Sequence, residues 1–194
     1  MRPALSTALA LLVAAATAFA AGGFTPSSGP LGTTLLLRGF GFPPIKKPRA
    51  LLLPQSGQTG LKKVEMKVLA YSEDQIDVQV VRGRAGVYGI ALLPAERRLA
   101  PVSVDGTFEI LGPRSGVSVP GTAFAGEAIE IVGEAFGAKK GRVTVGGKTA
   151  RVLTWNEGSV SVIVPRRLAP GPQDIVVTTK AGSSEPIAFT VAAP

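Results

Sequence analysis

Short segments in which apolar and polar residues alternate recur along the chain. The stretches "QIDVQV" at 75–80 and "SVSVIV" at 159–164 place isoleucine or valine at every second position, which is the period of a strand with one buried face. Other candidate strands are separated by Gly, Pro, Asn or Ser: 88–93, 142–145, 150–153, 174–179 and 187–191. No segment keeps the 3.6-residue period of a helix. The pattern predicts an all-β fold of the β-sandwich type.

The composition agrees with many short strands joined by turns. The chain has 24 glycines and 16 prolines among 194 residues, and both residue types favour turns and are disfavoured inside helices. A hydrophobic content of 45% with 18% charged residues is that of a globular protein. Since the chain has no cysteine, no disulfide can stabilise it, and each folded unit must bury enough apolar surface by itself.

The first residues have the pattern of an export signal. One cation, Arg2, precedes an apolar run that ends in Ala18-Phe19-Ala20, the small-x-small pattern of a signal peptidase site. We expect residues 1–20 to be a signal peptide and the mature chain to begin at or near Ala21. An uncleaved anchor is the alternative, but Ala, Ser and Thr dilute the run, which is shorter than the ~20 strongly apolar residues of a span.

Cleavage would leave a basic mature chain outside the cytoplasm. Loss of Arg2 leaves 20 of the 21 basic side chains against 13 acidic ones, a net charge of +7. We expect the mature chain to be secreted, periplasmic or associated with the cell envelope, with no transmembrane span. Lipid attachment through a cysteine is excluded because there is none.

The sequence also repeats itself. "LLLRGFGF" at 35–42 matches "IEIVGEAF" at 129–136, and 70–82 matches 154–166. The matches define a repeated unit of about 80–90 residues. Units of this length are domains rather than the repeats of a solenoid. We therefore predict two tandem domains, at 24–110 and 111–194. The link is expected within the stretch "LGPRSGVSVPGTAF", so a chain starting near Ser118 is expected to fold alone.

The second copy has Gly133 and Phe136 in a G-x-x-F motif, the Gly146-Gly147 turn and the aromatic Trp155. With these residues it resembles the IPT/TIG family of immunoglobulin-like domains, and the first copy resembles the same family less closely. The first departs from it, because "LPQSGQTGLKK" replaces the Gly-Gly turn. The resemblance implies two immunoglobulin-like β-sandwiches that contact proteins or glycans; it implies no particular ligand.

The glycines of the repeated phrase are predicted to be structural. Gly39 and Gly133 would let a strand turn into its loop without Cβ strain, and Phe42 and Phe136 would fold back into the core. A phosphate-binding loop would need a helix to follow, whereas Pro43-Pro44 follows the first copy.

Residues for catalysis are scarce. The chain has no histidine, which excludes the commonest general base and the Ser-His nucleophile pair. Glu127, Glu130 and Glu134 are close in sequence, but Glu130 alternates with two isoleucines and should face solvent. No loop gathers enough carboxylates for calcium. We therefore expect no enzyme activity, no cofactor and no metal, and a hydrolase of unrecognised type is the least favoured reading.

Two aromatic residues could contact a carbohydrate. Trp155 is the only tryptophan, and an exposed tryptophan on a β-sandwich can stack on a sugar. Tyr71 holds the matching position in the first copy, just before a strand. This equivalence favours a structural role for both rings, with carbohydrate stacking as the alternative.

Basic residues recur at matching points of the two copies. Lys46 and Lys47 match Lys139 and Lys140, and the pair at 82 and 84 matches the pair at 166 and 167. In tandem sandwiches these loops would meet at the junction. The predicted patch for an acidic partner comprises Arg82, Arg84, Lys139, Lys140 and Arg142. The alternative is that these cations only keep loops and strand edges soluble.

The sequence thus predicts a non-catalytic exported binding or structural module that mediates protein–protein contacts. The second hypothesis is a binder of anionic polysaccharide, carbohydrate or membrane headgroups, through the basic patch and the exposed aromatics. Nucleic acid is not expected as a partner, because the chain has an export signal and lacks a long basic recognition segment. The partner's identity and the oligomeric state stay open.

Overall fold

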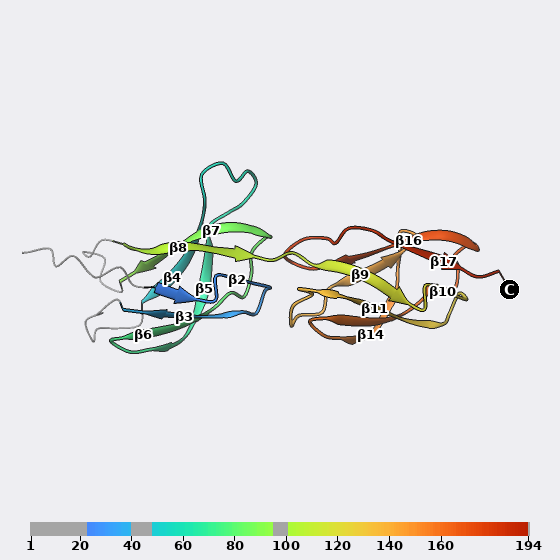
Figure 1. The fold of residues 1–194 in the computed structure, drawn as a ribbon, viewed down its shortest axis with the longest axis horizontal. Helices are drawn as coiled ribbons and strands as arrows, with labels where there is room; N and C mark the ends of the chain where they lie inside the picture. Colours follow the sequence, from blue (N-terminus) through green and yellow to red (C-terminus); the bar gives the residue numbers. More distant parts are fainter. Residues whose placement is uncertain (1–22, 40–47, 95–100, 194) are drawn as a thin grey trace, which may run out of the picture.

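The computed structural model describes residues 23–39, 48–94 and 101–193. Its strands gather in two bodies that follow one another along the long axis (Figure 1). Residues 23–110 form the N-terminal half and 111–193 the C-terminal half. The described residues contain strands and turns and no helix, so the all-β prediction is confirmed. The described residues therefore include no helix that could cross a membrane.

The N-terminal half is a sheet folded into two layers. Its strand order is β1-β3-β6-β5-β4-β7-β8-β2. The long strand β5 joins the layers, because its first residues pair with β4 and its last with β6. The strands are β1 (Gly23–Thr25), β2 (Ser28–Gly29), β3 (Thr34–Arg38), β4 (Arg49–Pro54), β5 (Val64–Tyr71), β6 (Gln75–Gln79), β7 (Gly86–Leu93) and β8 (Val102–Ile110).

The C-terminal half is a sandwich of two separate sheets. One has the order β14-β15-β11-β9 and the other β10-β17-β16-β12-β13. Of the seven strands expected from the sequence, five lie in this half and two, β6 and β7, in the N-terminal half, and all are present with small shifts at their ends. The strands are β9 (Arg114–Val119), β10 (Thr122–Ala123), β11 (Ala128–Glu134), β12 (Arg142–Val145), β13 (Lys148–Thr149), β14 (Arg151–Trp155), β15 (Ser159–Ile163), β16 (Gly171–Thr178) and β17 (Ile187–Val191).

The same strand pairing recurs in the two halves. The series β1-β3-β6-β5 corresponds to β9-β11-β15-β14, and β2 runs parallel to β8 as β10 does to β17. Tyr71 ends β5 and lies opposite Ile76, after a shift in the register. Trp155 ends β14 and lies opposite Val160, also after such a shift. The alignment of the two aromatic positions therefore holds in three dimensions.

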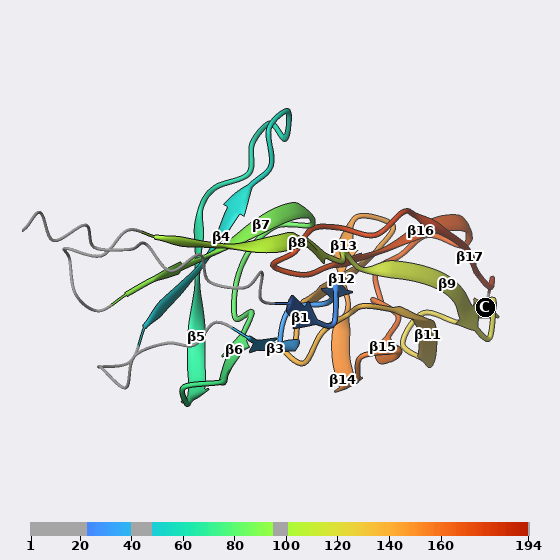
Figure 2. The ribbon, with the colours of Figure 1, turned by 60° about the vertical axis from the view of Figure 1, so that its left-hand side comes forward.

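The halves differ at the β4–β5 connection. In the C-terminal half, β12 turns tightly into β13 through Gly146 and Gly147, both with positive φ. In the N-terminal half, residues 55–63 form a longer, mostly exposed loop. This loop stands away from both layers (Figures 1 and 2). It is the "LPQSGQTGLKK" stretch that departs from the family pattern.

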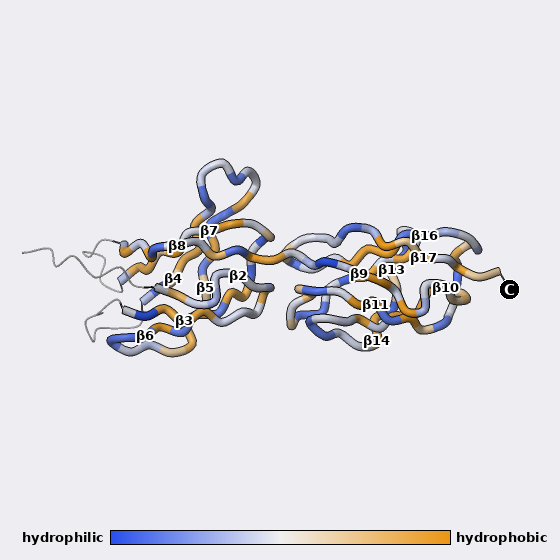
Figure 3. Tube along the Cα trace, viewed as in Figure 1, coloured by the Kyte–Doolittle hydropathy of each residue, from blue (hydrophilic) through white to orange (hydrophobic). Residues whose placement is uncertain are grey.

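Each half has its own hydrophobic core. Alternating residues of β6 and β15 point inward, as their period predicted: Ile76, Val78, Val160 and Val162 are fully buried. Figure 3 shows hydrophobic residues along the strands and hydrophilic ones at many of the turns. Ala181 belongs by sequence to the C-terminal half, yet it packs in the core cluster of the N-terminal half. The two halves are therefore in direct contact.

The two repeated glycines are needed for different reasons. Gly39 has a φ of +86° after β3, as expected for a strand that turns into a loop. Gly133 lies inside β11, where an added Cβ would lie 2.5 Å from Cζ of Phe136 and closer still to the carbonyl oxygen of Arg114. Its role is thus to admit neighbouring groups. Phe136 is 1% exposed, in the core as predicted, whereas Phe42 lies outside the described residues.

The link between the halves is shorter than expected. β8 ends at Ile110 and β9 begins at Arg114, so residues 111–113 connect them. Ser118 lies within β9 and opposite Ile131 of β11. Starting a shortened chain near Ser118 would therefore cut a paired strand, so Leu111, the first residue of the predicted second domain, is the better start.

Candidate binding site at the junction of the two halves

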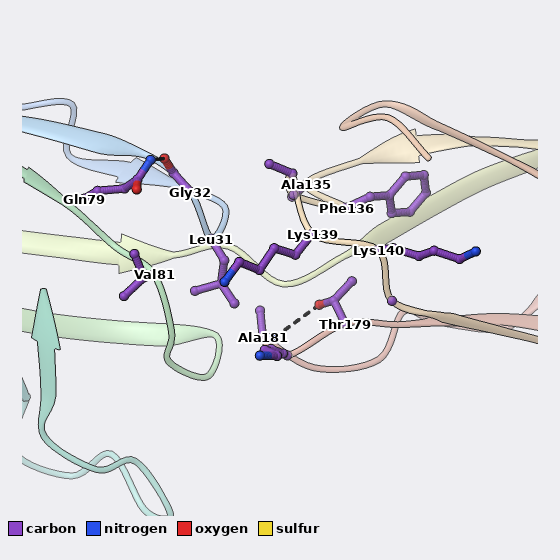
Figure 4. Close-up of a pocket in the computed structure, with 14 residues that line it drawn as sticks. Leu31, Gly32, Gln79, Val81, Ala135, Phe136, Lys139, Lys140, Thr179 and Ala181 are labelled. Carbon is purple, nitrogen blue, oxygen red and sulfur yellow. Dashed lines mark hydrogen bonds between the residues drawn. The ribbon is translucent and has the colours of Figure 1, made fainter. Parts of the chain in front are cut away.

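A cavity of about 230 Å³ lies where the two halves meet (Figure 4). We call it the apolar cavity, because most side chains in its wall are apolar. The N-terminal half provides the turn before β3 and the end of β6; the C-terminal half provides the loops after β11 and β16. The apolar side chains come from both: Leu31, Val81, Ala135, Phe136, Ala138 and Ala181.

Hydrogen bonds hold the walls of the apolar cavity. The amide of Ala85 donates to the carbonyl of Ala181 over 2.8 Å, directly across the junction. Nε2 of Gln79 donates to the carbonyl of Gly32 over 3.0 Å. On the other side, Nε1 of Trp155 donates to the carbonyl of Gly137 over 2.8 Å. Segments far apart in the sequence are thereby held around one space.

A second, shallow cavity of about 370 Å³, widely open to solvent, adjoins the first. Val81, Lys139 and Lys180 line both, so we treat them as two parts of one junction cleft. Lys67 and Arg82 complete its cationic wall, and we call this part the basic cavity. Its cations come from both halves, two from each.

The one carboxylate of the basic cavity is already paired. Glu65 lines the cavity, but its Oε1 lies 2.7 Å from Nε of Arg49. This hydrogen bond holds the pKa of Glu65 below its usual value, and the charge of Arg82 adds to the effect. Glu65 stays ionised and engaged with Arg49, so the four cations keep a net positive field in the cavity.

The structure brings together part of the predicted basic patch. Arg82 and Lys139 line the same cavity. Lys140 lines the apolar cavity, but its Nζ donates to the carbonyl of Val152 over 3.3 Å, and its side chain points away from the junction in Figure 4. Arg142 lines a separate cavity with Lys140. Arg84 lines neither part of the cleft, and its carbonyl accepts the hydroxyl of a buried tyrosine.

Two cations of the basic cavity were missed from the sequence. Lys67 is exposed on β5, and Lys180 lies in the turn after β16. Neither belongs to a basic pair, and only the packing of the halves places them beside Arg82 and Lys139. Lys46 and Lys47, which the repeat had matched to 139 and 140, lie outside the described residues.

Trp155 and Tyr71 have structural contacts in the two halves. The ring of Trp155 packs on Phe136 with the centroids 6.0 Å apart and the planes at 55°. Tyr71 packs against the N-terminal core, and partial burial together with nearby Glu73 raises its pKa. Neither ring lines the junction cleft. These contacts favour the structural reading over sugar stacking.

We expect the substitution Trp155→Phe to lower stability by about 1–3 kcal/mol, because the buried carbonyl of Gly137 loses its donor. Urea unfolding followed by far-UV circular dichroism measures this change. Retention on a neutral β-glucan gel should be the same for the variant and the wild type. A variant of unchanged stability that no longer binds the gel would instead identify Trp155 as a sugar platform.

The acidic residues considered for catalysis lie apart from the cleft. Glu127 accepts a hydrogen bond from the amide of Phe124 over 2.8 Å, which ties the turn before β11. Glu130 is exposed on β11, as its alternation with buried isoleucines predicted. Within the described ranges, no three His, Cys, Asp or Glu side chains are grouped as metal ligands would be.

Comparisons with known proteins found similar structures and one domain family. No curated protein matches the chain. The plexin A4 full extracellular region is 12% identical, with a TM-score of 0.47 over 87% of this chain and 18% of that one. The Prevotella bryantii surface glycan-binding protein PbSGBP-B is 19% identical, with a TM-score of 0.40 over 84% of this chain and 37% of that one.

A further structure, solved with a xylogluco-oligosaccharide, is 16% identical, with a TM-score of 0.48 over 89% of this chain and 40% of that one. This chain therefore spans less than half the length of each of the three. The match to a domain family covers only the C-terminal half. There, residues 115–191, from the second residue of β9 to the end of β17, match the IPT/TIG domain.

Proposed function

We propose that this protein is a non-catalytic, exported binding module that mediates protein–protein contacts at the cell envelope or outside the cell. The observation that carries the proposal is the convergence of Lys67, Arg82, Lys139 and Lys180 on one cavity between the halves. Like charges repel, and gathering them has a cost that an acidic partner would offset.

We further propose that the chain consists of two tandem IPT/TIG-like domains. The C-terminal half matches the family at 115–191. The N-terminal half repeats its pairing, including the parallel β2–β8 contact and the aromatic that ends β5. Two small sandwiches in series would act as a spacer that holds one binding surface at their junction. Export of the chain from the cytoplasm depends on removal of residues 1–20, which lie outside the described residues. Amino-terminal sequencing of the mature protein should therefore begin at or near Ala21.

The experiment is capture of a partner by the immobilised mature chain from an envelope fraction of the cells that make it. We expect retention of an acidic protein at low salt and its release as salt rises, since screening shortens the reach of surface charges to ~10 Å at about 0.1 M. The double variant Arg82→Gln/Lys139→Gln should lose the retained protein.

The matched control is Lys62→Gln/Lys63→Gln, which removes the same charge from the exposed β4–β5 loop. Equal losses in both variants would leave only a diffuse effect of net charge. Two results together would replace this proposal by the polysaccharide alternative. No protein would be specifically retained, and a polygalacturonate column would retain the wild type but not the Arg82→Gln/Lys139→Gln variant.

A further inference from the structure

We infer that the junction cleft binds a peptide segment in which one large apolar side chain is flanked by carboxylates. This inference rests on the proposed function and specifies the chemistry of the partner. The cleft has an apolar part and a basic part that share Val81, Lys139 and Lys180. One ligand can therefore contact both.

The apolar cavity is suited to a single side chain. Its volume of about 230 Å³ is several times the ~30 Å³ that one water molecule takes up in the liquid. The carbonyls of Gly32 and Gly137 in its wall already accept hydrogen bonds from Gln79 and Trp155. A leucine or phenylalanine side chain would gain free energy here by leaving water.

The basic cavity supplies the complementary charge. Within the described part of the chain, Lys67, Arg82, Lys139 and Lys180 have no carboxylate partner within ion-pair distance. Lys139 extends into the space between the halves, beside the apolar wall (Figure 4). Consecutive residues of an extended peptide advance by ~3.3 Å, so carboxylates next to the buried side chain would reach these cations.

A peptide fits the cleft better than an acidic polysaccharide does. Sugar binding commonly uses an exposed aromatic face together with hydrogen-bonding groups. The rings of Trp155 and Tyr71 lie outside the cleft, and Phe136, which lines it, is 1% exposed. Gln79 and Thr179 are the uncharged polar side chains that line its apolar part. An apolar wall beside cations would be poorly matched by a uniformly polar, anionic chain.

The test uses the full mature chain and two fluorescein-labelled peptides, Gly-Asp-Glu-Leu-Asp-Glu-Gly and the same peptide with glycine in place of leucine. Fluorescence anisotropy measures their dissociation constants at low salt. We expect the leucine peptide to bind about tenfold tighter or better, as burial of one such side chain predicts. Both peptides should bind more weakly as salt rises.

Variants then locate the two contacts. Ala138→Leu fills the apolar cavity from an exposed position, so it should remove the advantage of the leucine peptide and leave the glycine peptide unaffected. Ala169→Leu, at an exposed position outside the cleft, is its control. Lys139→Gln/Lys180→Gln should weaken both peptides about tenfold or more, whereas Lys62→Gln/Lys63→Gln should have a much smaller effect.

Three results would overturn the inference. The peptides could bind equally well, the cleft variants could behave like their controls, or a polygalacturonate oligomer could bind with the same dependence on Lys139 and Lys180 and displace the leucine peptide. The first two results leave capture of an envelope partner, which tests the proposed function, unaffected, whereas displacement by polygalacturonate would also favour the polysaccharide alternative to that function. If capture fails while the leucine peptide binds as described, the cleft chemistry holds and the proposed cellular role is wrong.

Discussion

The substitution Phe136→Ala is expected to destabilise the C-terminal half by about 3–5 kcal/mol, the usual cost of removing a buried phenylalanine ring. Phe136 is 1% exposed. Its ring contacts that of Trp155, and its amide donates to the carbonyl of Glu157 over 3.1 Å. The ring packs the loop after β11 against the end of β14, and the amide ties the same loop to the turn between β14 and β15. Urea unfolding followed by far-UV circular dichroism measures the loss.

The control is the same substitution at an exposed ring. Phe124 is 48% exposed, so Phe124→Ala should change the free energy of unfolding by no more than about 0.5 kcal/mol. Trp155 is the only tryptophan, and its fluorescence should change in Phe136→Ala and not in Phe124→Ala. Equal destabilisation by both variants would contradict the assignment of Phe136 to the core.

A chain that begins at Leu111 is expected to fold by itself, whereas one that begins at Ser118 is expected to be largely unfolded. The second chain lacks Arg114–Val117, so it keeps only two residues of β9, and Val132–Glu134 of β11 lose their partners. It also loses the neighbour that Gly133 admits at close range. The two chains differ by seven residues in length, so a difference in folding would come from β9 and not from chain size.

Circular dichroism and the cooperativity of urea unfolding distinguish the two chains. A folded, cooperative Ser118 chain would show that β9 is dispensable. A disordered Leu111 chain would show that the C-terminal half needs the N-terminal half, through contacts such as that of Ala181 with the N-terminal core. Only that second outcome would contradict the proposal of two tandem domains.

Local pattern was enough to predict most strands. Alternation at 75–80 and 159–164 placed β6 and β15, because a strand with one buried face imposes a period of two on its own residues. The matched aromatics at 71 and 155 likewise predicted equivalent positions, since the repeat preserves the order of its strands. The resemblance to IPT/TIG domains was confirmed for the C-terminal half.

Features that depend on two distant segments were predicted less well. Gly133 was assigned a turn, because the sequence around it does not show that Arg114 of β9 lies against it. β9 itself has weak alternation, and Val117 and Val119 are both 55% exposed, so its pairing with β11 left little trace. For the same reason the start of a separately folding chain was placed at Ser118, inside this strand.

The sequence by itself determined the all-β class, the strand positions and the repeated order, because each depends on residues close together in the chain. It also identified Arg82 and Lys139 as basic residues that a tandem arrangement could bring together. Only the tertiary structure decided that Lys67 and Lys180 join them, that Lys140 and Arg84 do not, and that an apolar cavity lies beside the charges. The physical reason is that a junction is formed by loops whose mutual approach depends on how whole sandwiches pack, and no local period records that packing.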